Sequence, residues 1–411
     1  MLKNYFKIAI AVLKRRKFFT FISLFGISFT LTILIVLTAF LDHLISPQYP
    51  DTKRNRSLYI TVAQMVDDKK GYYSNGPLSY YFLDKYVHSL KTPEKVAISS
   101  IFTPTNTYVN NKKLVINVKY TNVEFWDVHD FAFLEGRSYT AQEITNGDRV
   151  AVITEKTKLA YFGEASAVGK YIETDNVQYR VAGVVKNVPI TILFSYGDMF
   201  LPYTLAKTDR NNKEYSGMYT GMILAKSKAD LPRIQEEYQQ VVAKVPLDGK
   251  EYNKFYSNAD TYLASFTRTM FGKEQDSGKS KFIMWVGIFA LFFMLLPTLN
   301  LININISRIM ERSSEIGVRK AFGASSKTLV YQFIIENIIL TLIGGILGIL
   351  FSVIILAVIN NSELLPNVIL TVNVTVLAWA LLTCLVFGLF SGVYPAWRMS
   401  RLQVVAALKA Q

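Results

Sequence analysis

The chain has 411 residues, of which 51% are hydrophobic and only 18% are charged, and its formal net charge is +14. Soluble domains contain roughly 25% charged residues, and the hydrophobic residues of this chain gather in four runs that are each long enough to cross a bilayer of about 30 Å. This composition argues against a soluble cytosolic enzyme. The single cysteine, Cys384, also excludes an intramolecular disulfide and a cysteine-rich zinc site.

Residues 1–17 form a basic, amphipathic segment that we assign to the cytoplasm. The apolar residues that share one helical face are Leu2, Tyr5, Phe6, Ala9, Val12 and Leu13. This pattern is typical of a helix on the inner leaflet, although a continuous extension of the first membrane helix fits equally well. The first apolar run, 18–41, has no charge and is too long for a signal-peptide core of about 7–15 residues. It predicts a retained transmembrane helix.

Residues 42–281 are polar and predict a large mixed α/β domain outside the membrane. Apolar and polar residues alternate over 114–120 and 177–185, as in half-buried strands. Helical spacing of apolar residues predicts helices over 78–90 and 231–245. Two dipeptides are turn signals: Asn75-Gly76 and Asn146-Gly147.

This outer domain shows no catalytic constellation in its sequence. Asp127, His129 and Asp130 are close together, but such a cluster is more often a loop or a strand edge than a site. The run 272–280 is similar to a phosphate-binding loop, yet five residues instead of four separate its glycines and no strand precedes it. We therefore expect no metal, no cofactor and no nucleotide to be bound by this chain.

The rest of the chain divides into three further apolar spans and the polar segments between them. The spans are 282–304, 328–359 and 373–393, and the polar segments are 305–327, 360–372 and 394–411. Fourteen Lys and Arg residues lie in the N-terminal segment, the first polar segment and the C-terminal tail, whereas 360–372 has none. Basic residues concentrate in cytoplasmic loops, so both termini are predicted to be cytoplasmic. Most of the net positive charge lies in these predicted cytoplasmic segments, where it is explained by membrane topology. The charge is therefore no longer an argument for nucleic-acid binding.

Few polar groups interrupt the predicted spans, which argues against a transporter with its own proton relay. Glu336 is the one ionisable residue within a span, and it either pairs with a basic residue of 305–327 or helps to transmit movement from that loop. Small residues at four-residue spacing favour close helix packing over a moving interface. They are Gly344, Gly348 and Ser352 in the third span, and Cys384, Gly388 and Gly392 in the fourth.

The cytoplasmic loop contains the most distinctive segment of the chain. Residues 311–325 read ERSSEIGVRKAFGAS, in which Glu315 and Arg319 stand four residues apart and can pair on one helix face. This stretch resembles the signature of the MacB/FtsX-like family of ABC transporter permeases, and residues 392–409 resemble the closing motif of that family. The runs similar to its periplasmic core domain are Gly136-Arg137, Tyr161-Phe162-Gly163, Val168-Gly169-Lys170 and Val181-Ala182-Gly183-Val184-Val185.

The resemblance implies an α+β membrane protein of the bacterial inner membrane, with four transmembrane helices (one plus three) and a periplasmic core domain, 42–281, inserted between helices 1 and 2. It implies a second permease, identical or different, and a separate ABC-type ATPase that binds ATP and Mg. The loop would be the coupling helix for this ATPase, through Glu311, Arg312, Glu315, Ile316, Gly317, Arg319, Lys320, Gly323 and Ala324. Members of the family are thought to transmit ATP-driven closure to the outer domain, a process called mechanotransmission.

Three classes of function compete. The leading one is the membrane subunit of an exporter for antimicrobial compounds, peptides or lipoproteins, with a periplasmic adaptor and an outer-membrane channel as further partners. The alternative is an FtsX-like signalling permease that activates a cell-wall hydrolase and transports nothing. An enzyme with an outer active site is the weakest, because no triad, metal set or paired carboxylates emerge. We expect the chain to have no enzymatic activity of its own.

Overall fold

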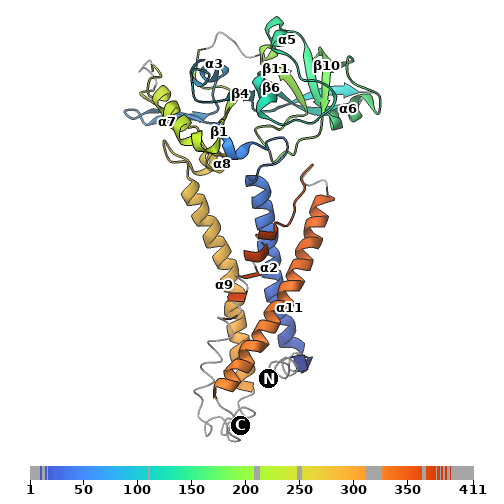
Figure 1. Cartoon of the computed structure of the whole chain (residues 1–411), viewed down its shortest axis with the longest axis vertical. Coiled ribbons are helices and arrows are strands. Elements are labelled where there is room, and N and C mark those ends of the chain that lie inside the picture. Colours follow the sequence, from blue (N-terminus) through green and yellow to red (C-terminus); the bar gives the residue numbers. More distant parts are fainter. Residues whose placement is uncertain are drawn as a thin grey trace. The chain divides into compact units, whose positions relative to one another are not determined.

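The structure, a computed structural model, consists of two compact units (Figure 1). The outer unit contains Leu44–Ile283 and Leu365–Val368, and the membrane unit contains the rest of the chain. The residues that the structure describes are 10–11, 14–15, 17–109, 112–207, 213–247, 252–311, 318, 326–362, 367–375, 377–379, 381–382, 385–386 and 389.

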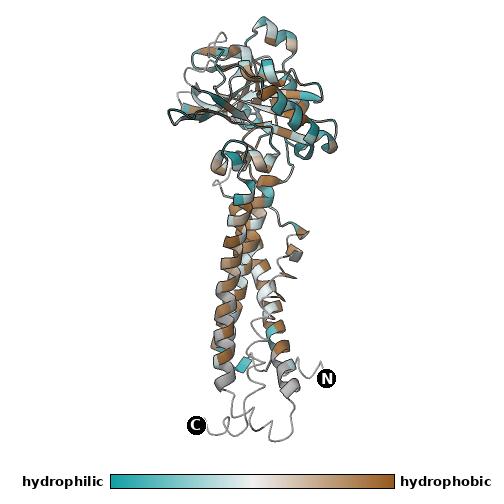
Figure 2. Cartoon of the chain, turned by 90° about the vertical axis from the view of Figure 1, so that its left-hand side faces the viewer, coloured by the Kyte–Doolittle hydropathy of each residue, from teal (hydrophilic) through white to brown (hydrophobic). Residues whose placement is uncertain are grey.

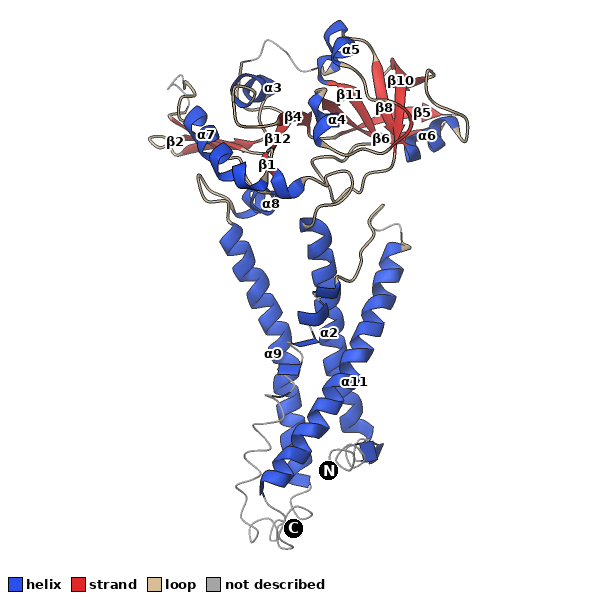
Figure 3. Cartoon of the chain, viewed as in Figure 1, coloured by secondary structure: helices blue, strands red, loops and turns tan. Residues whose placement is uncertain are grey.

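The outer unit is built on a ten-stranded mixed sheet (Figure 3). The strand order is β1-β12-β4-β6-β11-β8-β10-β7, with β5 paired to β6 and β9 paired to β10, and a separate sheet has the order β13-β2-β3. Most neighbours are antiparallel, whereas β11 runs parallel to β6 and β10 runs parallel to β8. The strands are β1 (Ser57–Ile60), β2 (Ala63–Asp67), β3 (Tyr72–Gly76), β4 (Lys95–Ser100), β5 (Thr103–Val109), β6 (Lys112–Thr121), β7 (Phe133–Gly136), β8 (Val150–Thr154), β9 (Tyr171–Thr174), β10 (Val177–Val185), β11 (Met199–Pro202), β12 (Tyr219–Leu224) and β13 (Lys254–Ser257).

Buried apolar side chains cover both faces of the large sheet. Successive residues of a strand point to opposite faces. On β8, Val150 and Val152 accordingly join one core cluster, whereas Ala151 and Ile153 join another. A third cluster lies at the β1 end, where the apolar face of the amphipathic helix α7 (Leu231–Val242) is buried against Leu58 and Ile60. The outer unit therefore has its own extensive core.

Short helices complete the outer unit. They are η1 (Arg54–Arg56), α3 (Tyr80–Phe82), η2 (Leu83–Val87), α4 (Glu124–Val128), α5 (Ala141–Asn146), α6 (Glu155–Phe162), η3 (Tyr203–Leu205), η4 (Lys228–Asp230) and α8 (Tyr262–Phe271). α5 begins with a capping box between Thr140 and Glu143 and ends at Gly147, whose φ of 71° is in the left-handed region. Such a glycine is a common helix stop, so the Asn146-Gly147 signal marks a helix end.

The structure corrects one turn and one helix of the sequence analysis. The prediction of a turn at Asn75-Gly76 was wrong, because both residues pair with β2 at the end of β3. The chain turns earlier, where Asp67 Oδ1 accepts hydrogen bonds from the amides of Lys69 and Lys70. The helix predicted over 78–90 is shorter, and its second half is the π-helical η2.

The membrane unit contains three long helices among its described residues: α2 (Lys17–Ile45), α9 (Lys279–Glu311) and α11 (Ser326–Asn360). Two described helices, Lys17–Ile45 and Ile334–Asn360, are long and apolar enough to cross a membrane. Figure 2 shows hydrophobic residues along much of these helices. The predicted N-terminal amphipathic helix, the fourth span, 373–393, and the tail, 394–411, lie mostly or wholly outside the described residues.

Candidate functional site: a helix seam and two buried arginine junctions

α2 and α11 approach closely through small residues of α11. A Cβ atom added to Gly344 would lie 2.7 Å from Ile27 Cγ2, and one added to Gly348 would lie 2.9 Å from Leu31 Cβ. The hydroxyl of Thr32 lies 3.1 Å from the carbonyl oxygen of Gly348, which makes a hydrogen bond between the helices. Ser352 of the predicted face is also fully buried. Only glycine allows this approach, so these residues set the α2–α11 seam, defined here as the contact of α11 with residues 27–32.

The other predicted membrane-unit residues are placed only in part. Glu336 is 1% exposed on α11, beside the buried Asn337. Glu311 is the last residue of α9, but its side chain is not described. The predicted residues outside the described part of the chain are Arg312, Glu315, Ile316, Gly317, Arg319, Lys320, Gly323, Ala324, Gly388 and Gly392.

Asp127, His129 and Asp130 each contact a different partner in the outer unit. Lys95 Nζ lies 3.0 Å from the Asp127 carboxylate, and Lys53 Nζ lies 2.8 Å from that of Asp130. The His129 ring is buried, with Nδ1 2.9 Å from the carbonyl oxygen of Phe125, and burial lowers its pKa. Within the described residues no group of three or more His, Cys, Asp or Glu side chains could hold a metal ion. The three side chains therefore have separate partners.

A buried arginine holds the end of α2. Arg54 Nη1 donates to the carbonyl oxygens of Leu44, at 2.9 Å, and Ser46, at 2.8 Å. Its Nε donates to Asp51 Oδ2 at 3.0 Å, and both side chains are at most 2% exposed. The last carbonyls of a helix have no partner within the helix, so Arg54 satisfies groups that are otherwise costly to bury.

Two tyrosines complete the cluster around Arg54, which is the first of the two arginine junctions. The guanidinium of Arg54 lies 3.5 Å from the ring centroid of Tyr262, and the hydroxyl of Tyr59 donates to Asp51 Oδ2 at 2.7 Å. Burial, followed by the charge of Asp51, raises the pKa of Tyr59 well above its ordinary value. The hydroxyl therefore stays protonated and remains a donor.

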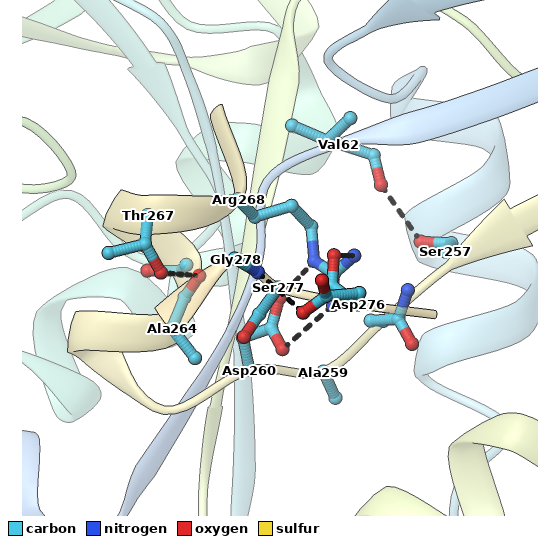
Figure 4. A network of polar contacts seen from close by, with 12 residues as sticks. Val62, Ser257, Ala259, Asp260, Ala264, Thr267, Arg268, Asp276, Ser277 and Gly278 are labelled. Atoms are coloured by element: carbon cyan, nitrogen blue, oxygen red, sulfur yellow. Dashed lines mark hydrogen bonds and ion pairs between the residues drawn. The ribbon is translucent and has the colours of Figure 1, made fainter. Parts of the chain in front are cut away.

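A second buried arginine holds the segment before α9 (Figure 4). The guanidinium of Arg268 pairs with Asp260 through both Nε and Nη2. Its Nη1 donates to the carbonyl oxygens of Glu274, at 2.9 Å, and Asp276, at 3.3 Å. A guanidinium has five donors in a rigid fork, so it can serve a carboxylate and several carbonyls together.

The sequence analysis missed both arginines. Arg54 and Asp51 lie in an unremarkable polar stretch, and eight positions separate Arg268 from Asp260. The one available signal is the run 272–280, which has glycines at 272 and 278, precedes an apolar run and only partly resembles a phosphate loop. In the structure this run is the turn that leads into α9, with Gly278 at a φ of +72°.

Two of the glycines in the family-like runs of the outer domain, Gly136 and Gly183, allow close packing. Gly136 has a φ of +63°, and a Cβ added there would lie 2.2 Å from the carbonyl oxygen of Ala182. One added to Gly183 would lie 2.4 Å from the carbonyl oxygen of Arg137. These two glycines therefore allow β7 and β10 to approach each other.

Comparison with known proteins covers both units. Residues 20–241 match the family model of the MacB-like periplasmic core domain, and residues 287–404 match that of the FtsX-like permease C-terminal region. The macrolide export ATP-binding/permease protein MacB of Mannheimia succiniciproducens is 26% identical over 73% of this chain and 44% of that protein. The ABC transporter permease YknZ of Bacillus subtilis is 24% identical over 80% of this chain and 79% of that protein. The chain thus spans less than half of this MacB protein and most of YknZ.

Two solved structures are similar to the chain at low identity. The extracellular domain of YknZ from Gram-positive bacteria aligns with a TM-score of 0.35 and 18% identity, over 44% of this chain and 91% of that chain. The periplasmic region of MacB from Actinobacillus actinomycetemcomitans aligns with a TM-score of 0.36 and 15% identity, over 50% of this chain and 88% of that chain.

Proposed function

Because the chain belongs to the MacB/FtsX-like family of ABC transporter permeases, we propose that it is the membrane subunit of a complex driven by a separate cytoplasmic ATPase. ATP hydrolysis by that partner moves the outer domain, 42–281, which acts on substrates or proteins outside the membrane. The observation that carries this proposal is that the two family models together match both the outer and the membrane unit. We place the protein in the bacterial inner membrane as a dimer, with four spans and both termini in the cytoplasm.

Mechanotransmission suits the described membrane helices better than a substrate path through the bilayer. α2 contains no charged residue from Phe18 to Leu41, and α11 contains one acidic residue, Glu336. Residues that line a path for polar substrates or protons through a membrane are usually ionisable. The α2–α11 seam is instead tightly packed, so that displacement of one helix displaces the other.

The ATPase binds, in this proposal, to the coupling loop around Glu315 and Arg319. ATP and Mg are held by the partner, and the permease has no catalytic residue of its own. For export, the cargo class is antimicrobial compounds, peptides or lipoproteins, in line with a relative whose name specifies macrolide export. A periplasmic adaptor and an outer-membrane channel would complete such a complex.

The experiment that tests the proposal is a mild-detergent pull-down of the tagged protein from native membranes, with mass spectrometry of the proteins recovered. We expect a stoichiometric ABC-type ATPase, whose hydrolysis rate depends on the permease. The double variant Glu315→Arg/Arg319→Glu keeps the net charge and should reduce this stimulation about tenfold, a typical coupling between linked sites. Expression and orientation should stay normal, because the basic residues of the flanks are retained in number.

A matched control changes the same kind of charge elsewhere on the cytoplasmic side. Lys14→Glu should leave the stimulation intact, since Lys14 precedes the first span and is not in the loop. Unchanged stimulation in the double variant would refute the assignment of the loop. Recovery of an outer-membrane channel would support export, whereas a cell-wall hydrolase as the only outer partner would replace export by signalling.

A further inference from the structure

The two buried arginines belong to one continuous network inside the outer unit. From it we infer that Arg54 and Arg268 form a coupling bridge, which fixes the segments leading to α2 and α9 to one common element. Arg54, Asp51, Tyr59, Asp260, Arg268 and α8 make up this bridge. A displacement of either segment is thereby imposed on the other and on β1. The inference rests on the proposed function, because it assigns the residues by which the outer domain receives helix movement.

The link between the two arginines is the backbone of Tyr59 and Asp260. The amide of Tyr59 donates to the carbonyl oxygen of Asp260 at 2.7 Å, and the amide of Asp260 donates back at 2.9 Å. Tyr59 binds Asp51 through its hydroxyl, and Asp260 binds Arg268 through its carboxylate. Arg268 thus contacts the Tyr59–Asp260 pair directly, and Arg54 reaches the same pair through Asp51.

Helix α8 joins the arginines a second time. Its first residue, Tyr262, stacks under the guanidinium of Arg54, and Arg268 lies in its last turn. The rings of Tyr59 and Tyr262 meet edge to face, with centroids 5.2 Å apart. Two parallel connections make the arrangement stiff, because neither arginine can move without moving α8 or the Tyr59–Asp260 pair.

The contacts around Arg268, the second arginine junction, extend to the first turn of α9. The amide of Gly278 donates to Asp276 Oδ1 at 2.8 Å, and the amide of Phe282 in turn donates to the carbonyl oxygen of Gly278 at 3.0 Å. A Cβ added to Gly278 would lie 2.4 Å from Phe271 Cβ, so the turn is packed directly against the end of α8. The side chain of Gln64 also accepts from the amide of Glu274 at 2.7 Å.

Because its members are buried, the bridge is expected to be either complete or lost as a whole. Arg54, Asp51, Tyr59, Asp260 and Arg268 are all at most 7% exposed. Two guanidinium and two carboxylate groups balance in charge, which makes their burial tolerable. Removing one partner leaves an uncompensated buried charge, so the bridge should not survive in part. An ion pair at the surface is screened by water and salt, so it would break more easily when a force acts on it.

The test measures the outer ends of α2 and α9 in the permease alone. Spin labels are attached to Ile45→Cys and Ser280→Cys in a Cys384→Ala background, in lipid nanodiscs, and their distance distribution is recorded by pulsed electron paramagnetic resonance. Both labelled positions are exposed. Arg54→Lys and Arg268→Lys keep the charge but place all donors on one nitrogen, which cannot reproduce the rigid fork that joins the carboxylate and the carbonyls. Each should broaden the distribution about twofold and speed amide exchange of 44–60 and 260–278 about tenfold.

Arg56→Lys is the matched control. Its guanidinium makes a partly exposed pair with Glu94 at 2.7 Å and lies outside the bridge, so this variant should leave the distribution unchanged. If an arginine variant fails to fold, Asp260→Asn keeps the shape of the carboxylate and should broaden the distribution to a smaller extent. An unchanged distribution in all three bridge variants would overturn the inference. Recovery of the ATPase is measured separately, so failure of the proposed function would be seen independently of this result.

Discussion

At the scale of single residues, Lys119 is a buried charge that the proposed function does not use. The side chain is fully buried on β6, and its Nζ donates to the carbonyl oxygen of Ser100 at 2.7 Å. Burial lowers the pKa of Lys119 to about 7. An unfolded lysine has a pKa of about 10.4, so between these values the unfolded chain binds more protons than the folded one. The free energy of unfolding should therefore rise with pH across this window.

We expect Lys119→Met to remove this contribution, which is at most about 1.4 kcal/mol per pH unit. The measurement is chemical unfolding of the full chain in detergent between pH 7 and pH 10. The fluorescence of Trp126, which is partly buried against a core cluster of the outer unit, reports unfolding once Trp285, Trp379 and Trp397 are replaced by Phe. Lys156→Met, at an exposed position, should keep the pH dependence. Identical profiles for the wild type and Lys119→Met would contradict the argument.

At the scale of elements, the α2–α11 seam depends on two glycines having no side chain. Gly348→Leu should force the helices apart and break the hydrogen bond from Thr32. Overpacking of this kind costs about 1–3 kcal/mol. Thermal unfolding of the detergent-solubilised protein should show a lower midpoint, and ATPase stimulation should fall with it.

Gly287 on α9 provides the control for this prediction. A Cβ atom added there would have no other heavy atom within 4 Å, so Gly287→Leu should leave the midpoint almost unchanged. Equal losses from both variants would indicate a general effect of leucine in the helices. The seam would then not depend on close approach.

The sequence predicted helices and strands well where the periodic spacing of apolar residues was strong. The spacing of Ile234 and Tyr238 in α7 and the alternation in β10 are set by burial of one face, which the sequence displays directly. Asn75-Gly76 misled the analysis, because pairing with β2 outweighed an intrinsic turn preference. The small residues of α11 indicated a packing face, but only the structure identified α2 as its partner.

At the scale of the whole molecule, the distribution of Lys and Arg predicts an orientation in the membrane, and this prediction can be tested directly. In a Cys384→Ala background, Ala165→Cys in the outer domain should react with a membrane-impermeant maleimide in spheroplasts with an intact inner membrane. Ser313→Cys, in the loop predicted to be cytoplasmic, should react only after permeabilisation, because positively charged loops stay inside. The unlabelled cysteine-free chain is the control, and labelling of Ser313→Cys in intact spheroplasts would reverse the topology.

The long apolar helices α2 and α11 were predictable, because the signal for each lies within one continuous stretch of sequence. The bridge between Arg54 and Arg268 was not. Its members come from 51–59 and 260–268, which meet only when β1 pairs with Asp260 in the folded domain. No short motif encodes such a network, since each residue alone has an ordinary sequence neighbourhood.

Helix α8 restricts where residues can be inserted into the chain or deleted from it. Tyr262 and Arg268 lie six positions apart on this ten-residue helix. One inserted residue between them would rotate Arg268 by about 100° around the helix axis and shift it by about 1.5 Å, away from Asp260. The β2–β3 turn, in contrast, can lengthen without affecting either arginine. Insertions and deletions should therefore accumulate in the hairpins of divergent variants and spare α8, even where its exposed side chains are freely exchanged.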